Sequence, residues 1–476
     1  MKKILNIWHT TSAPAKASIV FLLVSIIQKG LAYITTPIYT NLLTTDEFGK
    51  VAVFLTWFQL IGIVSMFSLQ AGVFNNGMME YKHDRDGYMF SMLMLSNIIT
   101  VITGVIFIGG YRIWEKYIKL DMPLILLMFA LFLTQPAMNF WQSRNRFEFK
   151  YKMLAVATLS SCIFSPIIAV ICIFLFPNNK VYGRLFGAEC TLIAFYLFFY
   201  IYIVIKSKGK LNTSYWRFAL LFNLPLIPHY LSQYLLNSSD KLMISYLIND
   251  TETAYYNVAY SVGAVVTIVW SAINTSLLPF TYENCEKKNY GHISDITNPL
   301  ILLYGAACLL IILFAPELIS IMAPKEYSIA IYVVPPIVGG VFFQSLYYIF
   351  ANAIYYYKKP KYVMYASFSA AIINLVLNYI FIPKYGFIAA GYTTLISFLI
   401  QVLMDYFAMK KVLGFSIYND KFLLFISSIV ICISLISNIT YDYPIVRYIV
   451  FVFLITVLVI KKNYFISILK RIRNKT

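Results

Sequence analysis

The feature that most constrains this chain is a succession of apolar runs, each about twenty residues long and separated by short polar loops. A run of this length is what an α-helix needs to cross a hydrocarbon layer about 30 Å thick. Inside lipid the backbone must satisfy its own hydrogen bonds, so such runs are expected to be helices. The chain is 60% hydrophobic and only 12% charged, and its mean hydropathy is +0.73. The sequence therefore predicts an all-α integral membrane protein with many crossings.

About fourteen transmembrane helices are predicted from these runs. We expect two repeats of six helices each around a central cleft, residues 1–210 and 211–412, followed by two helices and a basic tail in 413–476. The predicted helices are residues 17–43, 51–75, 88–110, 123–142, 153–176, 185–205, 218–248, 254–280, 296–315, 329–355, 362–382, 387–409, 422–439 and 445–460.

The charge of the chain is explained by its topology. The formal net charge is +18, which in a soluble protein would suggest nucleic acid as a partner. Here most of the 38 Lys and Arg fall in alternate short loops and at the two ends of the chain. Basic loops stay on the cytoplasmic side of a membrane. The pattern predicts that both termini are cytoplasmic and that nucleic acid is not a partner.

The two predicted halves contain similar segments at equivalent places. Residues 182–195 and 385–398 match at six positions, including a Tyr-Gly pair and a Thr-Leu-Ile run. A weaker match, at nearly the same separation, links residues 46–49 with residues 249–252. Six helices return a chain to its starting side, so these are expected to be parallel repeats with the substrate between them.

Four charged side chains inside predicted helices are selected as candidates: Lys29, Glu189, Asp240 and Lys241. A charge near the centre of a membrane helix costs at least about 2.5 kcal/mol, and such residues usually face the protein interior and serve a function. Glu189 and Asp240 are candidates for coupling transport to an ion. Lys241 is also compatible with a structural role, either extending toward the interface or pairing with an acidic residue.

Polar residues on two helices extend this set. At 100° per residue, polar side chains share one face on the first helix and one on the seventh, and such a face should avoid lipid. Pro37, Pro225 and Pro228 are expected to kink these two helices. Both faces are predicted to line the substrate cavity. Their residues are Lys29, Tyr33, Thr36 and Thr40 on the first helix, and His229, Gln233, Asn237 and Asp240 on the seventh.

The sequence lacks the motifs of several other functions. It contains no G-x-x-x-x-G-K-[ST] phosphate loop, no G-x-S-x-G elbow and no H-E-x-x-H pair. Its six cysteines form no C-x-x-C pair, and no His lies at a metal-ligand spacing. We therefore expect a transporter with no bound cofactor or metal, and neither an enzyme nor a nucleotide-driven pump.

Three segments resemble a known family. The first helix and the residues 43–49 that follow it, Leu-Thr-Thr-Asp-Glu-Phe-Gly, look like the first helix and loop of the polysaccharide flippases. Ser-Ser-Asp-Lys at 238–241 looks like their seventh-helix acidic-basic motif, and residues 374–386 look like their most recognisable segment. The chain thus resembles, over nearly its full length, the Wzx-type flippases for O-antigen, capsule and teichuronic acid of the multidrug/oligosaccharidyl-lipid/polysaccharide exporter superfamily, whose fold is that of the MATE transporters.

The resemblance implies a substrate and a reaction. The substrate would be a polysaccharide repeat unit on undecaprenyl pyrophosphate, moved by alternating access from the inner to the outer leaflet of the bacterial cytoplasmic membrane. Its partners would be this lipid-linked glycan, membrane lipid and the polymerase and other proteins of polysaccharide assembly. Lys29 and Lys241 would meet the anionic head group, because Lys pairs with phosphate as a point charge. Coupling to H⁺ or to Na⁺ stays open.

Other functions remain as alternatives. A cation-coupled multidrug antiporter of the same fold would favour acidic cavity residues, whereas the charge in the middle of the first helix is Lys29. A lipid II flippase normally carries more basic residues than this chain shows. A membrane enzyme that processes glycans would need a large external loop or a cluster of intramembrane His and Arg, and the sequence has neither.

Overall fold

The structure is a computed structural model that describes residues 13–461. The described residues are almost entirely helical and contain no strand, which confirms the predicted all-α class. The predicted basic end at Lys2 and Lys3 and the basic tail after residue 461 lie outside the described residues. The helices group into two compact units, residues 1–231 and 232–476.

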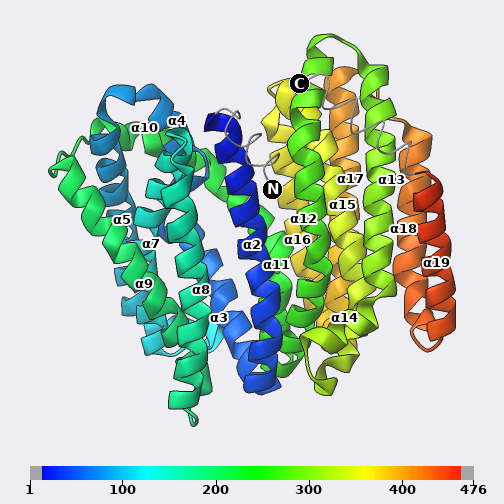
Figure 1. Ribbon diagram of the computed structural model, residues 1–476, viewed down its shortest axis with the longest axis horizontal. Coiled ribbons are helices and arrows are strands. Elements are labelled where there is room, and N and C mark those ends of the chain that lie inside the picture. Colours follow the sequence, from blue (N-terminus) through cyan, green and yellow to red (C-terminus); the bar gives the residue numbers. More distant parts are fainter. Residues whose placement is uncertain (1–12, 462–476) are drawn as a thin grey trace, which may run out of the picture. The chain divides into compact units, whose positions relative to one another are not determined.

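The first unit contains six long helices and several short ones (Figure 1). Its elements are α2 (Ala13–Leu42), α3 (Thr45–Ser65), η1 (Leu69–Ala71), α4 (Val73–Glu80), η2 (Lys82–Asp84), α5 (Arg85–Gly109), α6 (Tyr111–Ile118), α7 (Met122–Phe147), α8 (Tyr151–Leu175), α9 (Lys180–Ser207), α10 (Ser214–Asn223) and η3 (Leu224–Leu226).

The helix α11 (Ile227–Leu247) carries the chain from the first unit into the second. The further elements of the second unit are α12 (Asp250–Glu286), α13 (Tyr290–Leu313), α14 (Ala315–Met322), η4 (Lys325–Val333), α15 (Val334–Tyr356), α16 (Pro360–Tyr385), α17 (Phe387–Leu413), α18 (Asp420–Thr440) and α19 (Pro444–Ile460).

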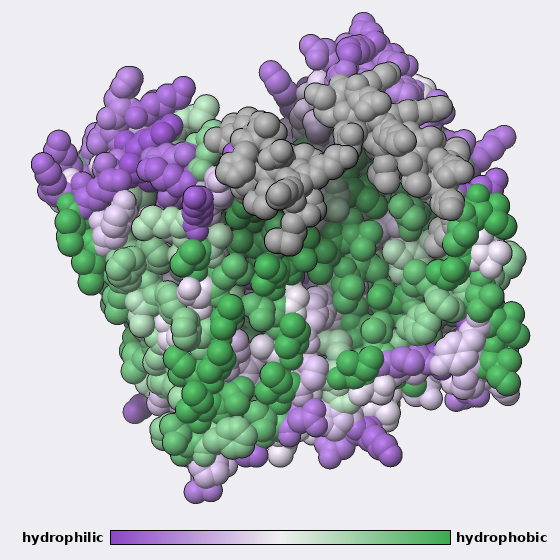
Figure 2. All heavy atoms as spheres, viewed as in Figure 1, coloured by the Kyte–Doolittle hydropathy of each residue, from purple (hydrophilic) through white to green (hydrophobic). Residues whose placement is uncertain are grey.

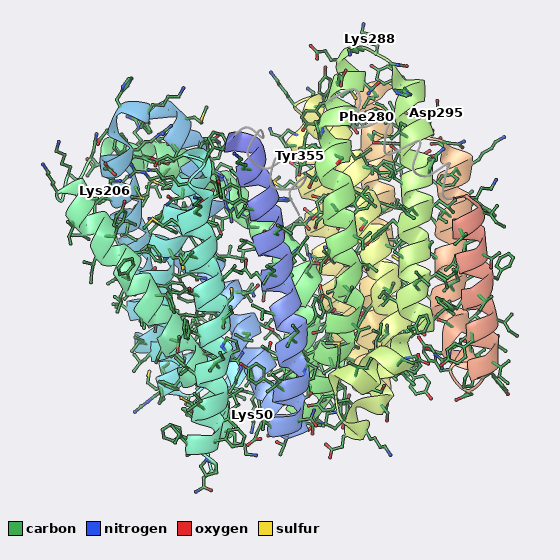
Figure 3. The ribbon with its side chains drawn as sticks, in the orientation of Figure 1. Lys50, Lys206, Phe280, Lys288, Asp295 and Tyr355 are labelled. Carbon is green, nitrogen blue, oxygen red and sulfur yellow. The ribbon has the colours of Figure 1, made fainter. Side chains whose placement is uncertain are left out.

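The helices have the character of membrane spans. Every predicted apolar run coincides with a helix, and within residues 13–461 eleven helices are long and apolar enough to cross a membrane. In each unit hydrophobic side chains cover the middle of the helices and hydrophilic ones gather at their ends (Figure 2). Lys50 and Lys206, for example, lie at opposite ends of the first unit (Figure 3). The chain is therefore a multi-pass membrane protein, while the full predicted helix count stays a prediction, since α2, α11 and α19 are not among the eleven.

Two predicted helices differ from those observed. The second was expected to reach residue 75, but α3 ends at Ser65 because Phe67 and Ser68 take left-handed backbone conformations with φ of 54° and 44°. The seventh was expected to be one helix over 218–248, but it divides into α10 and α11 at the 3-10 turn Leu224–Leu226. Pro225 lies in this turn and has no N–H group to continue an α-helix.

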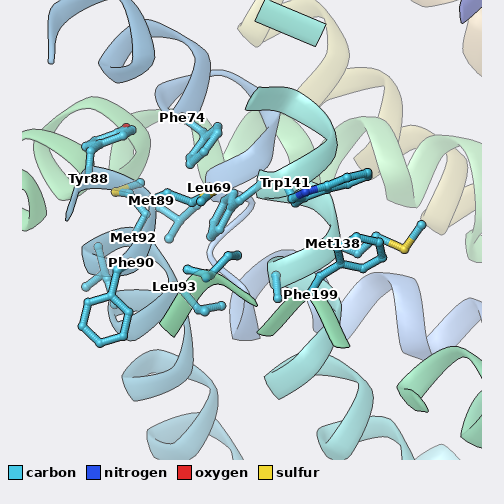
Figure 4. Close-up of a cluster of buried hydrophobic side chains, with 14 of the residues drawn as sticks. Leu69, Phe74, Tyr88, Met89, Phe90, Met92, Leu93, Met138, Trp141 and Phe199 are labelled. Atoms are coloured by element: carbon cyan, nitrogen blue, oxygen red, sulfur yellow. The ribbon is translucent and has the colours of Figure 1, made fainter. Parts of the chain in front are cut away.

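Large aromatic rings form the core of the first unit (Figure 4). Phe74 of α4 stacks on Phe140 of α7 with ring centroids 4.4 Å apart, and Trp141 lies 4.3 Å from Phe199 of α9. Tyr88 of α5 is fully buried beside them and donates a hydrogen bond to the carbonyl of Val73. These rings join α4, α5, α7 and α9.

The second unit is arranged around α15. Nearly all its residues are buried, and it packs against α12, α13, α16, α17 and α18. The contact between α15 and α17 is close: a Cβ on Gly391 would lie 2.5 Å from a side-chain carbon of Val333, the residue just before α15. This central helix positions the polar groups described below.

The close packing of α8 on α9 depends on two glycines. Gly183 and Gly187 are four residues apart on α9 and so lie on one face. A Cβ at Gly183 would be 2.7 Å from the backbone oxygen of Cys172, and a Cβ at Gly187 would be 2.9 Å from the Cα of Ala169. Small residues at such spacing let membrane helices approach closely.

We expect Gly183→Val to lower stability by about 1–3 kcal/mol, because the added atoms overlap the backbone of α8, which cannot move aside as a flexible side chain could. Thermal unfolding of the purified chain would measure the effect. Gly109→Ala is the matched control, because nothing lies within 4 Å of the added Cβ. Equal melting temperatures for the Gly183 variant and the wild type would contradict this account.

Candidate functional site

A polar cavity of about 340 Å³ lies inside the first unit, between α2, α7, α8 and α9. Its lining is rich in amides and hydroxyls, which is unusual for the inside of a membrane bundle. The polar residues of the lining are Gln28, Thr35, Tyr39, Gln135, Asn139, Gln142, Thr158, Ser161, Ser165, Arg184 and Tyr196.

Arg184 is the charged residue among those that line this cavity. Its guanidinium carbon lies 4.4 Å from the centre of the Tyr39 ring, a cation–π distance that holds the side chain in place. Two of its nitrogens, Nε and Nη1, are buried and have no hydrogen-bond partner among the described residues. The same is true of the side-chain oxygen of Gln135. Buried groups without partners are costly, so the cavity offers both donors and an acceptor to a polar ligand.

Glu189 follows Arg184 on α9. It is buried, at 7% exposure, and it is close enough to Arg184 for their charges to interact. No ion pair within bonding distance joins the two among the described residues. Glu189, which was predicted as a candidate for ion coupling, thus lies near Arg184, which was not among the predicted site residues.

The predicted polar face of α2 is not the face that lines this cavity. Lys29 is exposed, Tyr33 and Thr36 are half-buried, and Thr40 donates a hydrogen bond to the carbonyl of Pro37. The cavity is lined instead by Gln28, Leu31, Thr35 and Tyr39. At 100° per residue these positions lie on a separate face of α2, so the helix carries two polar faces.

Asp240 is the centre of a buried hydrogen-bond network in the second unit. Its carboxylate accepts hydrogen bonds from Tyr256 of α12 at 2.5 Å, Thr394 of α17 at 2.7 Å and the amide of Asn378 of α16 at 2.6 Å. Asp240 is 0% exposed. Burial disfavours the ionised form of a carboxylate and hydrogen-bond donors favour it, so these three donors offset part of the cost of a negative charge at Asp240.

Asn374 of α16 connects the other members of this network. It donates to the hydroxyl of Thr394 at 3.1 Å, and its oxygen accepts from Ser239 at 3.1 Å and from Asn378 at 3.2 Å. Asn378 in turn accepts a hydrogen bond from Thr393. Four helices, α11, α12, α16 and α17, therefore supply groups to one enclosed polar site.

The other predicted residues of α11 lie in different surroundings. Lys241 is not paired with Asp240 or Glu189; its ammonium lies 4.8 Å from the ring centre of Tyr260. Asn237 accepts a hydrogen bond from Gln344 of α15 at 2.5 Å and donates to the carbonyl of Gln233. His229 is half-buried and stands beside Tyr230. Asp240 and Asn237 thus face the interior of the second unit, and a shared cavity for the faces of α2 and α11 stays a prediction.

Sequence analysis missed three groups. Arg184 was treated only as part of the repeat, because it stands near a predicted helix start. Asn374 and Asn378 were noticed as a family-like segment, but an amide in a helix gives no signal of its partner. Asp405 lies inside a predicted helix and is fully buried, so its charge in an apolar run was a signal that could have been used.

Comparison with known proteins identifies the family. A family model described as polysaccharide biosynthesis protein matches residues 15–284, more than half of the chain. The chain belongs to that family. A second model, MatE, matches residues 225–380. The membership of the polysaccharide flippase family that the sequence predicted is therefore confirmed.

Similar proteins include a curated flippase and two solved structures. The probable low-salt glycan biosynthesis flippase Agl15 of Haloferax volcanii is 24% identical over 169 residues, which is 35% of this chain and 36% of that protein. The chain thus matches about a third of the length of that relative. The lipid II flippase MurJ, in an inward closed conformation, has a TM-score of 0.67 at 15% identity and covers 94% of this chain and 100% of MurJ. An inward-facing MATE family transporter has a TM-score of 0.63 at 12% identity, covering 82% and 96%.

These structures show that the family member described here has the fold of MurJ and the MATE transporters. The relatives are flippases and transporters, which is consistent with the prediction that the chain is a transporter. At such identities the likeness establishes the fold alone, so the roles of individual residues rest on their own geometry.

We expect Asn374→Leu to destabilise the chain by roughly 2–4 kcal/mol, because it leaves Ser239, Asn378 and Thr394 each short of a buried partner. The measurement is thermal unfolding in detergent, with Ser428→Ala on the exposed face of α18 as the control. Combining Asn374→Leu with Ser239→Ala should cost less than the sum of the two single changes, since the two side chains share a hydrogen bond. Additive effects would show that the network is not connected as described.

Proposed function

We propose that this protein is a flippase for lipid-linked glycans in the bacterial cytoplasmic membrane, with both termini in the cytoplasm. Its substrate is a polysaccharide repeat unit carried on undecaprenyl pyrophosphate, which it moves from the inner to the outer leaflet by alternating access. Membership of the polysaccharide biosynthesis family and the fold shared with MurJ support this proposal. Polysaccharide polymerase and other assembly proteins would act on the product.

The observation that carries the proposal is the polar cavity of the first unit. Sugars lose their hydrogen bonds to water on entering a bilayer, and each unpaired polar group there costs several kcal/mol. A cavity with amides, hydroxyls and the unpaired donors of Arg184 can replace those bonds. Arg184 and the exposed Lys29 of the same unit supply positive charge for an anionic head group. A drug antiporter for cations would be poorly served by a guanidinium at this place.

The coupling ion in this proposal is a cation held at Asp240. Hard cations such as Na⁺ prefer oxygen ligands, and the network around Asp240 offers carboxylate, amide and hydroxyl oxygens. The hydroxyls of Tyr256 and Thr394 now donate to the carboxylate, but each can turn a lone pair toward a cation. Glu189 is the alternative, and its neighbour Arg184 makes it less suited to holding a positive ion.

Deleting the gene in its native host is expected to leave carrier-linked repeat units accumulating on the cytoplasmic side, because the glycan cannot cross the bilayer unaided. Mass spectrometry of undecaprenyl-pyrophosphate-linked glycan, with a leaflet-access assay, would measure this. Unchanged glycan together with increased sensitivity to cationic drugs would replace the flippase proposal with the antiporter alternative.

Complementation of the deletion would then test the cavity. Arg184→Gln keeps much of the side-chain size but removes the charge, and Lys29→Ala removes the exposed ammonium; both are expected to reduce rescue at least tenfold. Arg112→Gln on α6 removes an exposed charge far from the cavity lining and is the matched control. Full rescue by Arg184→Gln at normal membrane levels would exclude the cavity as the binding site.

Replacing Asp240 by Asn should abolish the dependence of transport on a cation gradient, because the fixed negative charge that holds the cation is gone. The assay is glycan-lipid flipping in vesicles with and without an inward or outward Na⁺ gradient. Wild-type gradient dependence in Asp240→Asn would show that coupling occurs elsewhere.

A further inference from the structure

Three buried acidic side chains lie in the membrane-spanning helices of the described chain, and each has different surroundings. Asp240 accepts hydrogen bonds from three side chains. Glu189 has Arg184 near it. Asp405 of α17, in contrast, is 0% exposed, and neither of its carboxyl oxygens has a hydrogen-bond partner among the described residues. Asp405 has no part in the function proposed above.

The neighbour of Asp405 on the same face of α17 is equally unpaired. Gln401 lies one turn earlier, is 0% exposed, and neither its amide nitrogen nor its amide oxygen has a partner in the part of the chain described. Side chains four residues apart on a helix are adjacent. The pair therefore presents an acid and an amide together in a closed, apolar position, eight residues before the end of α17 at Leu413.

Within residues 13–461, the groups that face this pair do not include a cation that could neutralise it. Tyr347 and Tyr355 of α15 are close enough to interact with the charge of Asp405, and Tyr355 lies near the end of its helix (Figure 3). Tyr282 of α12 is close enough to Tyr355 for an electrostatic interaction between the two side chains. The next cations along α17 are engaged elsewhere: Lys410 pairs with Asp420 of α18 at 2.9 Å, and Lys411 lies over the ring of Tyr362 of α16.

An ionised carboxylate in these surroundings would be an uncompensated charge in a low-dielectric interior. The cost of such a charge is far larger than that of a neutral polar group, so a carboxyl without a partner takes up a proton instead. A protonated Asp405 is also a hydrogen-bond donor, and Gln401 one turn away carries an amide oxygen without a donor. Asp240 shows the opposite condition, because its donors stabilise the carboxylate.

We propose that Asp405, together with Gln401, forms a proton-binding site in the second unit, separate from the cation site at Asp240, and that transport is coupled to uptake and release of the proton there. The coupling half of this proposal rests on the transport function proposed above, whereas the proton site itself does not. Binding forms the O–H bond of the carboxylic acid, and release returns the proton to water with no change at any other group.

Infrared spectroscopy tests the site directly. Spectra of the full chain in lipid vesicles at pH 7 should contain the carbonyl stretch of a protonated carboxylic acid. The band should be lost in Asp405→Asn and kept in Asp240→Asn. Gln401→Leu should shift the band, because the acid loses its adjacent amide. An unchanged band in Asp405→Asn would overturn the proton site, whether or not the protein transports glycan.

Stability provides a second, independent readout. Asparagine has the shape of a neutral aspartic acid, so Asp405→Asn should melt within about a degree or two of the wild type if the acid is already protonated. If Asp405 were ionised and held by a partner, the same change would remove that interaction and lower the melting temperature clearly. A large fall for Asp405→Asn would therefore also overturn the proposal.

Coupling is tested by glycan-lipid flipping in vesicles with a proton gradient at constant Na⁺. The wild type should flip faster with the gradient, and Asp405→Asn should flip at a rate that no longer responds to it. Asp240→Asn is the comparison, because it should lose the response to Na⁺ and keep the response to protons. If Asp405→Asn responds to the proton gradient as the wild type does, the coupling is excluded. If no variant or wild type flips glycan-lipid, the flippase proposal fails while the infrared result still decides the proton site.

Discussion

The constraint on which this structure depends is that lipid offers no hydrogen bonds. Every backbone group must therefore be paired within its helix, and every polar side chain at depth must find a partner in the protein or remain unpaired at a cost. The first requirement explains why the described residues are helical with no strand. The second makes the few buried polar groups informative, because an apolar residue could have taken each of their places. Their partners, or the lack of them, indicate what each group is for.

The same residue type serves different purposes according to its partners. Asp240 accepts hydrogen bonds from α12, α16 and α17, which favour the negative charge that the proposed cation site requires. Asp405 has no donor within residues 13–461, and its burial there favours the neutral acid of the proposed proton site. Arg184 keeps its charge but lacks acceptors for two nitrogens, so it is suited to an anionic or hydroxyl-rich ligand. A transporter needs groups of these three kinds, because substrate and coupling ions must bind at depth and leave again.

The fold could be predicted from the sequence to a large extent, since apolar runs of membrane-spanning length can form little else. The boundaries were less predictable. The helix α3 ends where Phe67 and Ser68 take left-handed backbone conformations. Neither residue is a glycine, so the sequence gives no sign of this end. The site was only partly predictable. The face of α2 with Lys29 has a clear polar period, but Gln28, Thr35 and Tyr39 line the cavity. Periodicity finds a polar face on one helix and cannot tell which neighbour that face meets.

Partners across helices are the part that a sequence does not contain. Asp240 and Asn378 are 138 residues apart in the sequence, yet the amide of Asn378 donates a hydrogen bond to the carboxylate of Asp240 at 2.6 Å. Which buried acid is ionised depends on such partners, because the donors Tyr256, Asn378 and Thr394 favour the charged form of Asp240. With the proposed cation site at Asp240, it follows that the coupling ion could be exchanged without altering the acidic residue. A change of Asn378 or Thr394 to an apolar residue would remove a donor from Asp240 and favour a proton there, and neither residue lines the polar cavity of the first unit.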